Sequence, residues 1–182
     1  DIFSRTLDFS QFDLIYAGAQ KNMGPAGATL VVVKEEILGK TGRYIPSMLD
    51  YEKHIKAESM YNTPPVFPVY ASLLTLQWLK NLGGIAAIEK INEQKAQLLY
   101  TEINRNPLFK GTAATEDRSN MNATFVLTDE SLTEKFDTMW KAAGISGLTG
   151  HRSVGGYRAS MYNALPLESV EALVNVMKEL EK

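Results

Sequence analysis

The sequence predicts an α/β protein, because short apolar runs typical of strands are separated by longer segments with helical periodicity. Residues 12–16 and 28–33 are rich in aromatic or β-branched side chains, which is typical of buried strands. The run 122–128 has the same character and is followed by a segment whose apolar residues recur every three or four positions. The alternation of these two patterns favours a mixed fold.

Each remaining element follows from its own pattern. Helical spacing of apolar residues predicts helices over 66–81, 85–104, 131–143 and 166–180, and shorter apolar runs predict strands at 148–149 and 157–162. Ser131 and Glu134 match a capping box for the third helix. The second helix is long, about 30 Å at 1.5 Å per residue, and could link two lobes. We therefore expect two domains, 1–90 and 91–182.

Composition and charge exclude several classes of function. Of 182 residues 45% are hydrophobic, and 19 basic and 21 acidic residues give a net charge of −2 without a basic stripe for nucleic acid or a long apolar span for a membrane. Cysteine is absent, and His54, expected to be solvated, stands far from His151, so no metal site is expected. The first residues lack a secretory signal, which predicts a cytoplasmic protein.

The loop between the first two strands carries one lysine among small residues. It reads AGAQKNMGPAG from residue 17 to residue 27, and its glycines allow close backbone approach while Pro25 stiffens the turn. A lysine partly desolvated in such a loop has a lowered pKa and can form a Schiff base with pyridoxal phosphate. The alternative is that Lys21 is simply a solvated lysine in a strand connection.

Two further segments offer groups that bind anions. In the first, YNTPP at 61–65, two prolines force an extended backbone that presents the Asn62 amide and the Thr63 hydroxyl, although Thr63 could instead cap the following helix. The second, residues 147–160, surrounds His151, Arg152 and Arg158 with glycines whose backbone N–H groups are accessible. Guanidinium groups pair with carboxylate or phosphate, although a solvated surface turn is the alternative.

The three segments together resemble one family. The motifs AGAQKNMGPAG, YNTPP and GHRSVGGYRASMYNA, in this order and spacing, are similar to those of the phosphoserine aminotransferases, which use pyridoxal phosphate on a fold-type I scaffold. The resemblance extends over essentially all 182 residues. It implies the end of the large, mainly parallel α/β/α domain followed by the complete small C-terminal α/β domain.

The resemblance also implies roles for individual residues. Lys21 would form the Schiff base with pyridoxal phosphate and move the proton between the substrate α-carbon and the cofactor. Gln20 would contact the cofactor phosphate, and Asn62 and Thr63 would bind the cofactor phosphate of the other subunit of a homodimer. His151 and Arg152 would hold the substrate phosphate group, and Arg158 would hold the α-carboxylate.

The implied reaction passes an amino group between L-glutamate and 3-phosphohydroxypyruvate, giving O-phospho-L-serine and 2-oxoglutarate for serine biosynthesis. Some members also accept a substrate of pyridoxine biosynthesis. The aspartate that pairs with the pyridine nitrogen in this family would precede Asp1, so we expect the chain to be a C-terminal fragment that is a poor catalyst alone. The alternatives are another fold-type I aminotransferase and a non-catalytic module that binds anions or dimerises.

Overall fold

The computed structural model describes residues 2–182 and divides into two compact units, one ending at Gly84 and the other running from Ile85 to Lys182. The predicted division at residues 90 and 91 falls inside the long helix α3 (Gly84–Arg105), whereas the compact units meet where that helix begins. Because each unit has its own internal packing, each is described separately. No helix within residues 2–182 is both long and apolar enough to cross a membrane.

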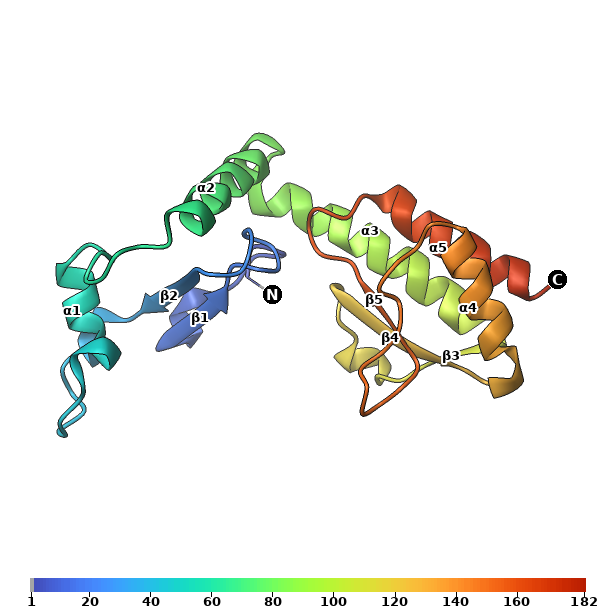
Figure 1. Cartoon of the computed structure of the whole chain (residues 1–182), viewed down its shortest axis with the longest axis horizontal. Coiled ribbons are helices and arrows are strands. Elements are labelled where there is room, and N and C mark those ends of the chain that lie inside the picture. Colours follow the sequence, from blue (N-terminus) through green and yellow to red (C-terminus); the bar gives the residue numbers. More distant parts are fainter. Residues whose placement is uncertain (1) are drawn as a thin grey trace. The chain divides into compact units, whose positions relative to one another are not determined.

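The first unit is built around a hairpin and a long helix (Figure 1). Strands β1 (Leu14–Gly18) and β2 (Thr29–Val33) pair antiparallel, with Tyr16 opposite Val31. Helices α1 (Tyr51–Lys56) and α2 (Val66–Asn81) follow. Short 3-10 turns lie at Phe9–Gln11, Glu35–Ile37 and Ser47–Leu49. The helix over 66–81 is therefore present with its predicted bounds, and the two predicted strands are present with shifts of one or two residues at their ends.

The expectation that the first two strands are buried is wrong for the described chain. Tyr16 is 73% exposed, and the two strands form a sheet with no third strand among residues 2–84. Helix α2 is likewise apolar on nearly all sides, with Val66 and Phe67 both 71% exposed. A two-stranded sheet is too small to cover both faces of its own strands. Many apolar side chains of this unit are therefore exposed when the unit is taken by itself.

The second unit places three helices against a three-stranded sheet (Figure 1). Strands β3 (Phe109–Gly111), β4 (Asn122–Leu127) and β5 (Tyr157–Ser160) are antiparallel, in the order β3-β4-β5. Alternate residues of β4 are buried, as expected for a strand with one face on the core. Helices α3, α4 (Thr133–Ala142) and α5 (Leu167–Leu180) supply the opposite side of that core.

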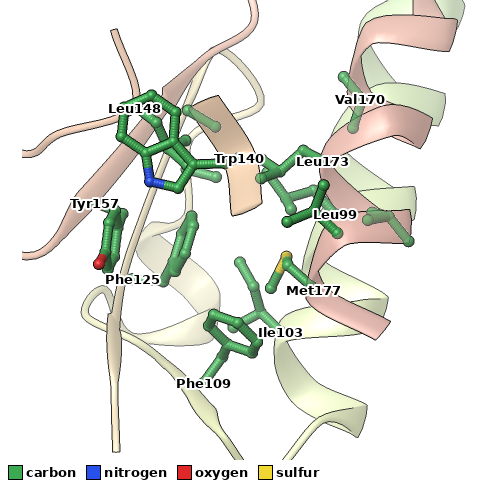
Figure 2. Close-up of a cluster of buried hydrophobic side chains, with 14 of the residues drawn as sticks. Leu99, Ile103, Phe109, Phe125, Trp140, Leu148, Tyr157, Val170, Leu173 and Met177 are labelled. Carbon is green, nitrogen blue, oxygen red and sulfur yellow. The ribbon is translucent and has the colours of Figure 1, made fainter. Parts of the chain in front are cut away.

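Aromatic rings fill the centre of the second unit (Figure 2). Phe136 is fully buried and meets Phe109 and Tyr157 edge-on, with ring centroids 5.2 and 5.0 Å apart. Phe125 stacks on Tyr157 at 5.5 Å. From the helices, Leu99, Leu173 and Met177 close the cluster. This packing fixes β5, the edge strand that carries Arg158.

Three local predictions for this chain are corrected by the structure. Ser131 and Glu134 do not form a capping box, because Asp129 accepts the Ser131 N–H at 2.9 Å and a 3-10 turn, Glu130–Leu132, precedes α4. Residues 148–149 do not form a strand and contribute one bridge, Thr149 to Tyr157. His54 is half-buried rather than solvated. Its Nε2 lies 2.9 Å from the Met48 carbonyl oxygen, and its ring meets Tyr61 edge-on.

Candidate active site

The loop that carries Lys21 is folded around a single carbonyl group. The Ala19 carbonyl accepts N–H groups from Lys21 at 2.7 Å, Met23 at 3.1 Å and Gly24 at 2.8 Å. The Ala19 N–H donates to the Ala28 carbonyl at 3.0 Å, which closes the loop across the hairpin. Ala19 itself is fully buried. These bonds fix the backbone on both sides of Lys21.

The same loop is packed against helix α2 through two glycines. A Cβ on Gly24 would lie 2.7 Å from Ser72 Oγ, and a Cβ on Gly27 would lie 2.8 Å from Pro68 Cγ. Asn22 is buried and its Nδ2 donates to the Ile2 carbonyl at 3.1 Å. The small residues are therefore required by close contact between loop and helix.

Gln20 and Lys21 point away from this packing, and both are exposed. The predicted partial desolvation of Lys21 is thus not provided by the described residues, because only the neighbouring Ala19, Asn22 and Met23 turn inward. Sequence composition could not reveal this, since a small-residue loop buries some of its side chains and exposes others. The Gln20 carboxamide lies close to Gly18, where a Cβ would collide with Gln20 Oε1.

Asn62 and Thr63 lie in the irregular segment between α1 and α2, with Asn62 in a bend, and both are exposed. Helix α2 begins after Pro65, which makes no side-chain capping bond, so Thr63 does not cap the helix. Asn62 Nδ2 lies 3.0 Å from Met48 Sδ, beside the contact between Tyr61 and His54. The capping alternative for Thr63 is therefore not the one found, and the anion-binding role of the two residues stays a prediction.

His151 and Arg152 lie on a tight turn in the second unit. The His151 carbonyl accepts the N–H groups of Val154 at 3.0 Å and Gly155 at 2.8 Å, and His151 Nδ1 lies 2.7 Å from Ser153 Oγ. Gly155 has a φ of +75°, a conformation that favours glycine. His151 and Arg152 are both exposed at the tip of this turn.

Arg158 leaves the edge strand β5 at the base of the same turn. Its N–H donates to the Leu148 carbonyl at 2.7 Å, and the residue is exposed. Arg158 is one of the residues that line a cavity of about 320 Å³, together with Ser146, Gly147 and Ser160. Within residues 2–182, no carboxylate lies within ion-pair distance of Arg152 or Arg158. Two arginines near one turn thus keep their donors available for an anion.

One buried cation was missed by the sequence analysis. Lys95 has no exposed surface, and its ammonium group donates to the carbonyls of Met161, Tyr162 and Leu165. Burial lowers the pKa of Lys95 to about 8. The signal was present, because Lys95 lies four residues after Ile91 and four before Leu99, on the apolar face of α3. Among residues 2–182 no three His, Asp or Glu side chains gather as a metal site would require.

Comparison with known proteins places this arrangement in a family. The family model for class-V aminotransferases matches residues 1–173. The phosphoserine aminotransferase of Flavobacterium psychrophilum is 86% identical over the whole chain, which covers 51% of that protein. The chain belongs to the class-V aminotransferase family.

Solved structures support the same assignment of the fold. The phosphoserine aminotransferase from Bacillus circulans subsp. alkalophilus matches all of this chain with a TM-score of 0.94 and 44% identity, over 50% of its own length. The pyridoxal-phosphate-bound phosphoserine aminotransferase from Trichomonas vaginalis matches 96% of this chain with a TM-score of 0.89 and 37% identity, over 50% of its length. The chain spans about half the length of the relatives it matches.

Proposed function

We propose that the complete gene product is a pyridoxal-phosphate-dependent aminotransferase that exchanges an amino group between L-glutamate and 3-phosphohydroxypyruvate. The products would be O-phospho-L-serine and 2-oxoglutarate, in serine biosynthesis, and a related substrate of pyridoxine biosynthesis is a further candidate. The observation that carries the proposal is the 86% identity, over the whole chain, to the phosphoserine aminotransferase of Flavobacterium psychrophilum. A cytoplasmic location belongs to the same proposal.

The residues of the lysine loop suit pyridoxal phosphate. Lys21 offers an exposed primary amine on a backbone fixed by the Ala19 carbonyl, and the Gln20 carboxamide occupies the space that a side chain at Gly18 would fill. When bound, the cofactor supplies an electron sink for the bonding electrons of the substrate α-carbon. Lys21 would hold the cofactor covalently between turnovers. Its Nζ would then take the proton from the substrate α-carbon and return it.

The two anion-binding groups have separate tasks in this proposal. Arg158 would bind the α-carboxylate that every amino-acid and oxo-acid substrate carries, while His151 and Arg152 would bind the phosphate group. Both arginines are exposed and lack a carboxylate partner within residues 2–182, so neither must break an ion pair to bind substrate. Guanidinium groups bind carboxylate and phosphate through paired N–H donors. The turn between Arg152 and Arg158 places the proposed phosphate site and the proposed carboxylate site at the two ends of one short segment.

A homodimer with shared active sites is the proposed assembly. Asn62 and Thr63 would bind the cofactor phosphate held by the other subunit, and both are exposed in the segment between α1 and α2. The neighbouring helix α2 exposes Val66, Phe67 and Tyr70, an apolar surface that is typical of an interface. Equilibrium sedimentation of the complete gene product should give the mass of a dimer. A monomer that is fully active would contradict shared sites.

Chemical labelling tests the role of Lys21. Incubation of the complete gene product with pyridoxal phosphate, followed by borohydride, should leave the cofactor on the peptide that contains Lys21, as read by mass spectrometry. Lys21→Ala should abolish both the label and transamination, whereas Lys40→Ala, at another exposed lysine of the same unit, should retain both. Full transaminase activity in Lys21→Ala would overturn the assignment.

Substrate preference tests the phosphate site against the alternatives. Phosphoserine should be a far better amino donor than alanine, and Arg152→Gln should weaken phosphoserine use while leaving the low alanine rate unchanged. Equal rates with the two donors, or no loss with Arg152→Gln, would favour another aminotransferase of the same fold. A complete gene product that binds phosphate but transfers no amino group would favour a non-catalytic module.

A further inference from the structure

Lys95 is a buried cation whose three donors all point at one turn. Its side chain has no exposed surface, and Nζ lies 3.1 Å from the Met161 carbonyl oxygen, 3.0 Å from that of Tyr162 and 3.1 Å from that of Leu165. An ammonium group has three N–H donors, so each is used once. No carboxylate within residues 2–182 lies at ion-pair distance from it.

A buried ammonium without a counter-ion is costly, which argues that its contacts matter. A neutral side chain of the same length would fill the space without that cost, but it would leave the three carbonyls without these donors. The Tyr162 carbonyl would keep a second donor, the Leu165 N–H at 2.9 Å, but the other two would lose the Lys95 donor. Carbonyl groups left without donors in a protein interior are destabilising, and the turn would rearrange to reach others. The buried ammonium group of Lys95 is therefore explained by its role in maintaining the conformation of residues 161–165.

This turn directly continues the strand that carries Arg158. Strand β5 ends at Ser160, and the next residue, Met161, donates its N–H to the Met121 carbonyl at 2.7 Å. A second tie from α3 reaches the same turn, because Asn92 Nδ2 donates to Asn163 Oδ1 at 2.9 Å. Helix α3 thus holds the C-terminal end of β5 through two buried polar side chains.

Strand β5 depends on this tie because it lies at the edge of its sheet. Among residues 2–182 only β4 pairs with it as a strand, placing Thr124 opposite Arg158. On the other side residues 148–150 contribute two hydrogen bonds. Those bonds, from Arg158 N–H to Leu148 and from Gly150 N–H to Gly156, end at Arg158. Beyond that point the strand is held by β4 and by the turn that Lys95 binds.

We propose that Lys95 is a positioning residue for the substrate-binding arginine: by holding the carbonyls of residues 161–165 it fixes the end of β5 and the direction in which Arg158 leaves the sheet. This inference rests on the proposed function, in which Arg158 binds the substrate α-carboxylate. A displaced guanidinium binds the carboxylate poorly before and during the reaction. The Michaelis constant should therefore change more than the turnover number.

Steady-state kinetics of the complete holoenzyme tests this role. Lys95→Met keeps an unbranched side chain as far as the position of Cε and removes the ammonium group with its three donors. It should raise KM for both glutamate and phosphoserine by about tenfold while kcat falls less than about threefold. Lys90→Met is the matched control, because Lys90 is an exposed lysine on the same helix, and it should leave both constants unchanged. Should Lys95→Met not fold, Lys95→Gln, which retains two donors, should raise KM by about threefold.

A double-mutant cycle shows whether Lys95 acts through Arg158. In an Arg158→Ala background, Lys95→Met should change KM less than about twofold, because coupled residues are not additive. A full tenfold increase in that background, or an unchanged KM in both Lys95 variants beside an impaired Arg158→Ala, would overturn the positioning role. A wild-type protein without transaminase activity, or an Arg158→Ala variant with normal KM, would instead overturn the proposed function.

Discussion

Gly27→Ala tests the contact that holds the lysine loop on helix α2. Gly27 has a φ of +117°, which residues with a side chain rarely adopt, and a Cβ there would lie 2.8 Å from Pro68 Cγ. Gly42 provides a matched control in the same unit. Its φ is +62°, and a Cβ there would meet nothing within 4 Å. Both substitutions strain the backbone, but only Gly27→Ala also creates a collision.

The two effects can be estimated separately. A residue with a side chain in the left-handed region near φ +60° costs about 1–2 kcal/mol, which applies to Gly42→Ala. The φ of Gly27 lies outside that region, so the backbone cost of Gly27→Ala is at least as large. Overpacking adds about 1–3 kcal/mol, and it applies to Gly27→Ala because the proline ring is too stiff to move aside. We therefore expect the free energy of unfolding to fall by about 2–5 kcal/mol for Gly27→Ala and by about 1–2 kcal/mol for Gly42→Ala.

Urea unfolding of the complete gene product, followed by tryptophan fluorescence, measures this difference, since Trp78 lies on α2. Pro68→Ala removes the colliding Cγ, so in the Gly27→Ala background it should recover the steric part, about 1–3 kcal/mol, and leave the backbone part. The apparent affinity for pyridoxal phosphate should fall with Gly27→Ala and not with Gly42→Ala. The reasoning is refuted if Gly27→Ala costs no more than Gly42→Ala, or if Pro68→Ala recovers nothing.

Three further predictions concern the second unit. Phe136→Ala removes a fully buried ring and should lower the free energy of unfolding by about 3–5 kcal/mol in a urea titration, and a cost under 1 kcal/mol would contradict the packing described. Tyr157→Phe removes the O–H that donates to Asp137 Oδ1 at 3.0 Å, so calorimetry should show a loss of about 1 kcal/mol; an unchanged melting temperature would mean that this bond contributes nothing. Burial lowers the pKa of Lys95 from 10.5 to about 8, so between pH 8 and pH 10.5 the unfolded chain binds more protons than the folded chain. The free energy of unfolding of the wild-type protein should therefore rise with pH in this range, relative to that of Lys95→Met, by at most about 3 kcal/mol. Parallel pH profiles of the two proteins would contradict this.

Local patterns were sufficient for most of the secondary structure. The helices over 66–81 and 85–104 appear as α2 and α3 with boundaries shifted by at most one residue, because each has a sustained apolar period and a clear glycine or proline at its end. The capping box at Ser131 failed for a local reason as well. Asp129 is an equally good acceptor two residues earlier, and it takes the Ser131 N–H.

Burial was predicted less well, because it depends on what each element packs against. The hairpin β1–β2 and helix α2 have the composition of a protein interior, yet Tyr16 and Phe67 are exposed in the unit that contains them. In contrast, Lys95 belongs to a residue type that is usually exposed, yet it is fully buried. Residue type alone does not distinguish these cases.

By itself the sequence determined the mixed fold, the order of its elements and the three motifs that mark Lys21, Asn62 with Thr63, and the 151–158 segment as candidate sites. Those features are local, since each depends on spacing within a few turns of chain. The structure decided that the Ala19 carbonyl gathers three N–H groups beneath Lys21, and that Lys95 holds the turn after Arg158. Both contacts depend on the folded path of the backbone, and the second joins residues 66 to 70 positions apart, which no local pattern records.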